Sequence, residues 1–211
     1  MLALVKVAVT GGIASGKTTV CKILKELGAH VESADEIVHQ LLSSVKIKAG
    51  IISGPQDNLG NKIITLLGPD VIVNDQLDRS QIAKKVFENP KLLKSLEQIL
   101  HPNVRKEIDN RYQQVISSKK TPLFVVEIPL LFESEMENDF DYTVAVVADE
   151  DVCKQRFVQH SKYDAHEFEK RYSRQLPMKE KTKRANFVIH NDGSLDDLYK
   201  DVKHVYTQLK R

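Results

Sequence analysis

The stretch Gly11-Gly12-Ile13-Ala14-Ser15-Gly16-Lys17-Thr18 fits the pattern G-x-x-x-x-G-K-[ST], in which a glycine-rich loop binds phosphate groups. A short apolar run, residues 4–9, precedes it and predicts a buried strand of a parallel sheet. Apolar residues at helical spacing follow in 20–27, and Gly28 stands where a helix commonly ends. This order of strand, loop and helix predicts a phosphate-binding P-loop rather than an ordinary glycine turn.

The chemistry of this loop indicates a bound nucleoside triphosphate. Backbone N–H groups of the loop, together with the positive end of the following helix dipole, bind phosphate oxygens. Lys17 adds a positive charge, and Thr18 adds a hydroxyl group for Mg²⁺. The residues of the loop that we expect to bind ATP are Gly11, Gly12, Ala14, Ser15, Gly16, Lys17, Thr18 and Thr19.

The composition of the 211 residues is typical of a globular protein, with 41% hydrophobic and 28% charged residues. The net charge of +2 does not indicate nucleic acid or an anionic membrane as a partner. Glu127 and Pro129 interrupt the long apolar run 123–132, so no membrane-spanning helix is expected. Cys21 and Cys153 have no metal-ligand companions, which favours buried thiols in a reducing cytoplasm. The oligomeric state is not readable from these features, and a monomer is assumed.

The segment 29–35 predicts a second strand that ends on Asp35. An aspartate at the carboxyl end of a parallel strand faces the crevice where open α/β sheets bind ligands. It is equally a favoured N-cap residue for the helix predicted over 36–42. Both roles remain open for Asp35, and they are compatible.

Residues 36–119 predict a mainly helical insertion between strands of the core. Glycines and prolines break up 43–76 into loops and short helices, and helical spacing returns in 82–100. His101-Pro102 is expected to interrupt the helix, which resumes in 104–116. An insertion of this kind, placed after the second strand, could hold an acceptor molecule.

The segment 123–133 predicts a third buried strand, whose apolar run is followed by acids and a proline. Burying the carboxylate of Glu127 without a partner would be costly, so we expect it to face the nucleotide site and Mg²⁺ or its water shell. A satisfied carboxylate at a strand end is the alternative. Residues 142–148 and 185–190 predict the fourth and fifth strands.

The fold expected from this order is an α/β fold of P-loop kinase type, with a five-stranded parallel sheet flanked by helices. Residues 1–35, 120–148 and 185–211 would form its nucleotide-binding core. The polar, helical and basic segment 149–184 precedes the last strand, where it could close as a helical lid over transferring phosphates. Charge-rich helices are most often solvated faces, so most of these basic side chains need no such role.

A P-loop of this kind fits three classes of protein: a small-molecule kinase, a GTPase switch, and an ATPase motor or regulator. A GTPase switch could use Asp57-Asn58-Leu59-Gly60, but no apolar strand precedes it and the guanine motif Asn-Lys-x-Asp is missing from the sequence. A motor would need a larger chain and a partner surface. A small-molecule kinase fits best, since the insertion could hold the acceptor and the basic segment could act as the lid.

The ordered motifs of the chain resemble those of the dephospho-CoA kinase family, from the first strand to the last helix. The segments that carry the resemblance are Thr10–Thr19, Ala34-Asp35, Leu77-Asp78-Arg79, Leu96–Pro102, Pro129-Leu130-Leu131-Phe132-Glu133 and Ala185–Gly193. The resemblance implies transfer of the ATP γ-phosphate to the ribose 3′-hydroxyl of dephospho-CoA, giving coenzyme A and ADP. ATP and dephospho-CoA would be the substrates, with Mg²⁺ as the metal ion.

The resemblance also implies roles for single residues. Asp35 matches the proposed base of the family, and Lys17, Arg156 and Arg171 would supply positive charge to the phosphates. Asn191 and Gly193 would border the adenine, while Thr18 and Glu127 would hold the metal. The residues that would contact the acceptor are Asp35, Arg79, His101, Pro129 and Leu130.

Three features depart from the family pattern. Ser33 stands where the family commonly has an aspartate, so a role shared by two acids would fall to Asp35 alone. His160 stands where a lid arginine is common, with Arg174 as a local substitute, and residues 43–62 form a longer loop than usual. Another P-loop kinase, acting on a nucleoside or nucleotide, and a catalytically weakened nucleotide-binding regulator are therefore the alternatives.

Overall fold

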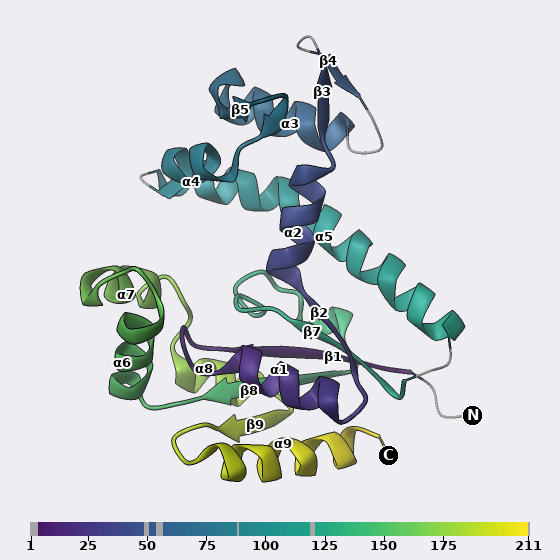
Figure 1. Cartoon of the computed structure of the whole chain (residues 1–211), viewed down its shortest axis with the longest axis vertical. Helices are drawn as coiled ribbons and strands as arrows, with labels where there is room; N and C mark the ends of the chain where they lie inside the picture. Colours follow the sequence, from purple (N-terminus) through teal and green to yellow (C-terminus); the bar gives the residue numbers. More distant parts are fainter. Residues whose placement is uncertain (1–3, 49–50, 54–56, 88, 119–120, 211) are drawn as a thin grey trace. The chain divides into compact units, whose positions relative to one another are not determined.

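The computed structural model describes residues 4–48, 51–53, 57–87, 89–118 and 121–210 (Figure 1). The chain divides into two compact units, each described by itself below. The first unit comprises Met1–Ser33 and Tyr112–Arg211, and the second unit comprises Ala34–Arg111.

The first unit is built on a sheet of five parallel strands, in the order β2-β7-β1-β8-β9. These strands are β1 (Val5–Gly11), β2 (His30–Ser33), β7 (Leu123–Glu127), β8 (Tyr142–Val147) and β9 (Phe187–His190). The apolar residues of the central strands are fully buried, as expected for a parallel sheet covered on both faces. The five-stranded parallel α/β sheet predicted from the sequence is confirmed.

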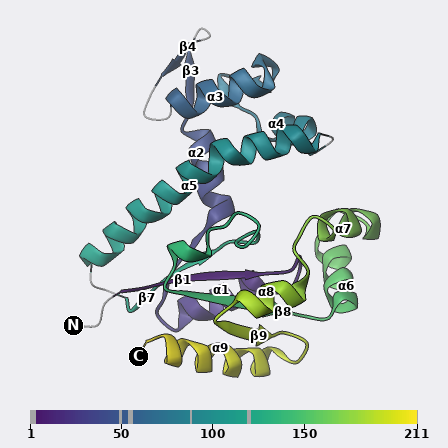
Figure 2. The same ribbon diagram turned by 180° about the vertical axis from the view of Figure 1, so that it is seen from behind.

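Helices cover both faces of this sheet. On one face, α1 (Lys17–Glu26) and α9 (Leu195–Leu209) pack against alternate strand residues such as Val7 and Val9 in one hydrophobic core. On the opposite face lies α8 (Met178–Arg184), which is behind the sheet in Figure 1 and in front of it in Figure 2. Because successive side chains of a strand point to opposite faces of the sheet, Val7 and Val9 face α1 and α9, and the residues between them face the other side.

The segment between β8 and β9 is helical, as predicted, and ends with α8. It begins with α6 (Glu150–His160), which Asp149 caps by accepting the N–H of Asp151. It continues with α7 (Ala165–Tyr172), where the carboxylate of Asp164 accepts the N–H of Glu167 in the same manner. Phe157 and Phe168 form a small separate core between these two helices.

The second unit is mainly helical. Its elements are α2 (Ala34–Ser43), β3 (Lys46–Lys48), β4 (Ile51–Ser53), α3 (Asp57–Leu67), the 3-10 turn η1 (Pro69–Val71), β5 (Ile72–Val73), β6 (Gln76–Leu77), α4 (Arg79–Phe87) and the first part of α5 (Pro90–Ser118). Strands β3 and β4 pair antiparallel, as do β5 and β6. The sequence predicted loops and short helices for 43–76, so these two small sheets are a correction. Gly50, Gly54 and Pro55 lie outside the described residues.

The predicted interruption at His101-Pro102 is wrong, because α5 continues through it. Proline removes one helical hydrogen bond and usually kinks the helix. Here the apolar positions on both sides, including Leu96 and Val104, are buried and hold the two halves in one helix. The side chain of Asn103 also donates to the carbonyl of Ile99, over 2.8 Å.

The second strand ends two residues earlier than predicted. It stops at Ser33, and α2 begins at Ala34, so Asp35 lies in the first turn of a helix rather than at a strand end. The N-cap alternative for Asp35 is also wrong, since the helix begins before it. A carboxylate in the first turn still interacts favourably with the helix dipole.

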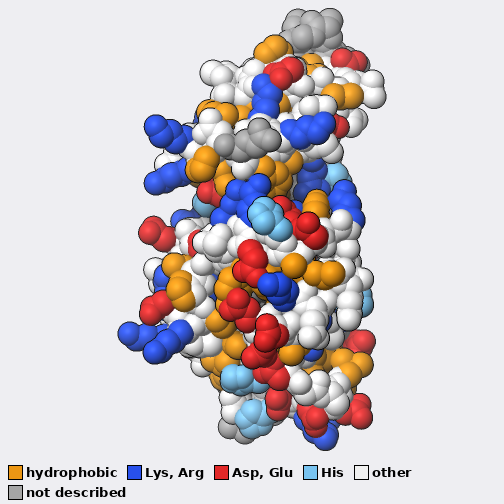
Figure 3. All heavy atoms as spheres, turned by 90° about the vertical axis from the view of Figure 1, so that its left-hand side faces the viewer, with side chains coloured by type: hydrophobic (Ala, Val, Ile, Leu, Met, Phe, Trp, Pro, Cys, Tyr) orange, Lys and Arg blue, Asp and Glu red, His pale blue; other side chains and the backbone are white. Residues whose placement is uncertain are grey.

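The described surface carries both signs of charge. On the face shown in Figure 3, acidic and basic side chains are interspersed among the described residues. Across the same described residues, none of the helices combines the length and the apolarity that crossing a membrane requires.

Candidate active site

The loop between β1 and α1 has the backbone geometry of a phosphate-binding loop. Gly11 and Gly16 both have positive φ, 149° and 98°. A Cβ atom on Gly11 would lie 2.2 Å from the Val146 carbonyl oxygen, and one on Gly16 would lie 2.1 Å from Nδ2 of Asn191. Glycine is therefore required at both positions for the close approach of neighbouring atoms as well as for φ.

The first turn of α1 is left open for a ligand. Gly16 precedes the helix without a side chain that could cap it, so N–H groups at this end are available to an anion. Lys17 is buried, and its Nζ folds back to donate to the Gly12 carbonyl over 2.7 Å. The lysine charge is thereby fixed beside the open helix end.

The hydroxyl of Thr18 is paired with the carboxylate of Glu127. Its Oγ1 donates to Oε1 over 3.0 Å and lies 3.3 Å from Oε2. Glu127 is the last residue of β7, and its register partners are Val9 in β1 and Ser33 in β2. Thr18 and Glu127, predicted from the sequence as metal-binding residues, are thus brought together at the carboxyl end of the sheet.

These two groups suit a magnesium ion rather than an all-protein metal site. The described residues hold no cluster of three or more histidine, cysteine or acidic side chains. Mg²⁺ usually binds through one or two protein oxygens and completes its shell with phosphate oxygens and waters. A hydroxyl and a carboxylate beside a phosphate-binding loop fit that requirement.

The negative charge of Glu127 also acts on the core behind the site. Burial raises the pKa of the Cys21 thiol, and the nearby Glu127 carboxylate raises it further, while Lys17 lowers it. Cys21 is therefore a neutral buried side chain at physiological pH and not a nucleophile.

A pocket of about 580 Å³ opens beside the loop within the first unit. It gathers eight of the predicted site residues, namely Ala14, Gly16, Lys17, Thr18, Thr19, Arg156, Asn191 and Gly193. It also includes five that the sequence did not assign to nucleotide binding, namely Phe157, His160, Ser161, Leu195 and Leu198. The volume and the mixture of apolar and polar groups suit a nucleotide-sized ligand.

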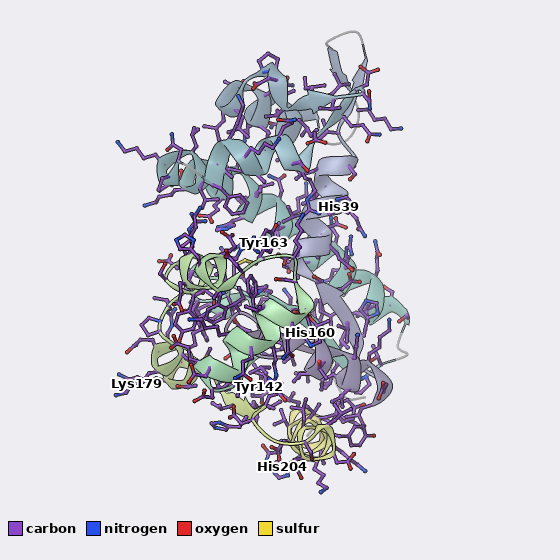
Figure 4. The ribbon with its side chains drawn as sticks, turned by 60° about the vertical axis from the view of Figure 1, so that its left-hand side comes forward. His39, Tyr142, His160, Tyr163, Lys179 and His204 are labelled. Carbon is purple, nitrogen blue, oxygen red and sulfur yellow. The ribbon has the colours of Figure 1, made fainter. Side chains whose placement is uncertain are left out.

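The residues that were missed carried only weak signals. Leu195 is 66% exposed at the start of α9, and an apolar side chain this exposed beside a pocket suits contact with a base. His160 ends α6, with Tyr163 just beyond it, and both are labelled in Figure 4. A lone exposed leucine has no sequence pattern that would single it out, and His160 stands out in the sequence only because it replaces a lid arginine common in the family.

Arg156 and Arg171 occupy different surroundings. Arg156 lines the pocket, and its Nη2 donates to the carbonyl of Asn191 over 3.0 Å. Arg171 lies on α7 outside the pocket lining, where Nε donates to Glu167 over 2.7 Å and the guanidinium stacks 4.4 Å from the ring of Tyr163. In this conformation, only Arg156 is at the nucleotide pocket.

The predicted acceptor residues are divided between the two units. Pro129 and Leu130 follow β7 in the first unit, where the carbonyl of Pro129 accepts hydrogen bonds from Thr10 and Lys181. Asp35, Arg79 and His101 belong to the second unit. Arg79 is exposed at the start of α4, and His101 is half-buried in the middle of α5.

Comparison with known proteins gives the family. The model of the dephospho-CoA kinase family matches residues 5–197. The chain belongs to the dephospho-CoA kinase family. The dephospho-CoA kinase of Protochlamydia amoebophila is 44% identical over 211 residues, covering all of this chain and 98% of that protein. The resemblance stated from the sequence motifs is therefore confirmed over the whole chain.

Solved structures agree with this membership. A crystal structure from Thermus thermophilus is 32% identical and superimposes with a TM-score of 0.77, covering 98% of each chain. The dephospho-CoA kinase from Campylobacter jejuni is 27% identical with a TM-score of 0.68, covering 97% of this chain and 96% of that one. The fold predicted from the sequence, a P-loop kinase fold, is confirmed.

Proposed function

We propose that the pocket beside the P-loop binds ATP and that its γ-phosphate passes to the ribose 3′-hydroxyl of dephospho-CoA. ATP-dependent phosphorylation of dephospho-CoA to coenzyme A is the reaction of the family to which this chain belongs. Family membership removes the basis for a kinase that acts on another small acceptor, and a catalytically weakened nucleotide-binding regulator is the alternative that the acceptor panel below tests. The assignment of residues to steps is the proposal developed below.

One observation carries the proposal. The Lys17 ammonium group and the hydrogen-bonded pair of Thr18 and Glu127 lie together at the open N-terminal end of α1. Phosphoryl transfer requires mainly positioning and neutralisation of charge. N–H groups at the start of α1 would bind the β- and γ-phosphate oxygens, and Lys17 would balance the charge that develops on them. Gly11 and Gly12 shape the loop without lining the pocket.

Magnesium would be held by Thr18 and Glu127. Their oxygens lie 3.0 Å apart, and a bound ion would replace the hydrogen bond between them. When bound, Mg²⁺ supplies positive charge to the β- and γ-phosphate oxygens. Without a bound ion, Glu127 accepts the hydrogen bond of the Thr18 hydroxyl. The backbone N–H groups in the first turn of α1 then stay available to the nucleotide.

Asp35 would accept the proton of the attacking hydroxyl. The chain itself limits its position, since only Ala34 lies between Ser33 and Asp35 and the two Cα–Cα steps span at most about 7 Å. Ser33 is the register partner of Glu127, and Ala34, the first residue of α2, follows Ser33 directly in the chain. A serine at position 33 leaves Asp35 as the acid assigned to proton transfer in this segment.

The remaining assignments concern the lid and the acceptor. The segment 149–184 would act as the lid, with Arg156 at the phosphates from the start and Arg171 joining them on closure. Nη1 of Arg156 is buried and has no hydrogen-bond partner within the described part of the chain, a costly state that a nucleotide oxygen could relieve after rearrangement. Arg79, His101, Pro129 and Leu130 would contact dephospho-CoA, with the insertion 36–119 selecting it.

The proposal also covers the cellular compartment, the oligomeric state and the partners of the enzyme. Both cysteines are free and buried, which suits a reducing compartment such as the cytoplasm. We propose a monomer without nucleic-acid or membrane partners, in keeping with its mixed surface charge.

An acceptor panel tests the proposal. Release of ADP is measured with ATP and Mg²⁺ in the presence of dephospho-CoA, nucleosides, nucleotides or no acceptor. Dephospho-CoA is expected to stimulate ADP release at least a hundredfold over the reaction with no acceptor. Stimulation by nucleosides but not by dephospho-CoA would refute the proposed acceptor, and ATP binding without any stimulation would indicate a weakened enzyme.

A further inference from the structure

Asn191 is held between the nucleotide loop and α6. It follows β9 directly and is 8% exposed. Its Nδ2 donates to the carbonyl of Ser15 over 2.8 Å, in a buried hydrogen bond that joins two ends of the chain. Its backbone N–H donates to Val147 over 2.7 Å, and its carbonyl accepts from Arg156 over 3.0 Å. Two hydrogen bonds therefore fix the backbone of Asn191, and one fixes its side chain, before any ligand arrives.

The bond to Ser15 determines the direction of the next N–H group. The carbonyl of Ser15 and the N–H of Gly16 belong to one planar trans peptide unit and point in opposite directions. Holding the carbonyl on Asn191 turns the Gly16 N–H away from Asn191, toward the other side of the loop. That N–H stands at the start of α1, among the groups available to a phosphate.

The contact at Gly16 supports the same assignment. A Cβ on Gly16 would lie 2.1 Å from Nδ2 of Asn191, so the side-chain amide packs directly on the backbone of the loop. This packing and the hydrogen bond from Nδ2 to Ser15 limit rotation of the amide, although its second N–H and its Oδ1 are not used by that bond. The sequence had placed Asn191 beside adenine.

We propose that Asn191 is a positioning residue for phosphate binding, which orients the Ser15-Gly16 peptide unit and does not select adenine. Arg156 contributes by fixing the backbone of Asn191, so α6 and the P-loop are joined through this residue. The inference rests on the proposed function, since the phosphates of ATP are the ligand of the loop.

The test compares ligands with and without a base. Binding of inorganic tripolyphosphate, ATP, GTP and adenosine is measured by calorimetry or competition for the wild type, Asn191→Asp and Asn191→Ala. Aspartate keeps the shape of asparagine but loses the donor and places a carboxylate against the Ser15 carbonyl. Gln208→Ala, which removes an exposed amide on α9, is the matched control.

The expected result is a loss of affinity of roughly tenfold or more for tripolyphosphate, ATP and GTP alike, larger for Asp than for Ala. Adenosine binding and the ratio of ATP to GTP affinity should stay within twofold of the wild type, as should every value for the control. Tripolyphosphate affinity that stays unchanged while ATP affinity falls would overturn the inference. A wild-type protein that binds neither ATP nor tripolyphosphate would instead refute the proposed function.

A measurement on the wild type covers the case in which both variants unfold. In NMR spectra, tripolyphosphate should shift the Gly16 amide resonance strongly, while the side-chain amide of Asn191 stays protected from hydrogen exchange. A side-chain amide of Asn191 that responds to adenosine and not to tripolyphosphate would contradict the inference.

Discussion

Nζ of Lys181 lies 2.8 Å from Oε1 of Glu133, and this ion pair joins α8 to the turn that follows β7. The side chain of Lys181 is fully buried, and its Nζ also donates to the carbonyl of Pro129. Oε1 of Glu133 accepts the N–H of Leu176 over 2.8 Å as well. This buried pair therefore joins α8 and Leu176, at the end of the proposed lid, to the turn that follows β7.

Removing one partner of this pair should destabilise the protein strongly. Lys181→Met leaves the Glu133 carboxylate in a largely buried site without its cation, and is expected to lower the free energy of unfolding by about 3 kcal/mol. Urea unfolding followed by circular dichroism measures it. The control is Lys179→Met, an exposed lysine on the same helix, labelled in Figure 4, expected to change by less than about 0.5 kcal/mol. Equal effects of the two variants would show that the pair does not stabilise the fold.

The carboxylate of Glu127 should set the magnesium requirement. Glu127→Gln keeps an oxygen that can accept from Thr18 but removes the charge, so the Mg²⁺ concentration for half-maximal turnover should rise about tenfold. Removal of Mg²⁺ with EDTA should abolish turnover in both proteins. The measurement is a Mg²⁺ titration at saturating ATP, with Glu26→Gln on the exposed side of α1 as the control. An identical titration curve for Glu127→Gln would remove Glu127 from the metal site.

Asp35 should affect turnover and leave nucleotide binding intact. A general base contributes about 10²-fold to 10⁴-fold, so Asp35→Asn should lower kcat at least a hundredfold with ATP affinity within threefold of the wild type. Glu36 is the neighbouring exposed acid in the same helical turn, and Glu36→Gln should stay within twofold in kcat. If the asparagine variant turns over at the wild-type rate, Asp35 is not the base.

The half-buried His101 should make stability depend on pH. Burial lowers the pKa of His101, and the charge of Arg105 lowers it further. The native state therefore binds fewer protons than the unfolded state, so the contribution of His101 is complete above the unfolded pKa of about 6.5. It is lost as the pH falls from there through the lower native pKa.

Urea unfolding between pH 7.5 and 5 checks this expectation. The wild type should lose more stability over this range than His101→Gln does. The exposed His204→Gln on α9 should follow the wild-type curve. A His101→Gln curve that is parallel to that of the wild type would contradict the assigned pKa shift.

The sequence predicted the core of the fold because its signals were local. The strand, Gly11 to Thr18 and the following helix are adjacent in the chain, and Gly11 and Gly16 each have a backbone reason that a pattern can express. The apolar runs of β7, β8 and β9 indicated buried parallel strands for the same reason. Such elements can be predicted from local sequence alone, without knowledge of contacts to distant parts of the chain.

What the sequence did not predict depends on contacts between distant residues. Pro102 suggested a break, but α5 continues through it, with buried apolar residues on both sides that a local pattern does not reveal. The paired strands β3 and β4 are too short to show a period. The bond from Asn191 to Ser15 joins residues 176 positions apart, and the pocket position of Leu195 has no local pattern.

The central claim is that this site phosphorylates dephospho-CoA on its ribose 3′-hydroxyl. The most direct measurement is the identification of the product, by mass spectrometry and ³¹P NMR, after incubation with ATP, Mg²⁺ and dephospho-CoA. The account predicts coenzyme A, with one new phosphate monoester on the 3′-oxygen and one ADP per product. Unchanged dephospho-CoA, or a phosphate at another position, would contradict it.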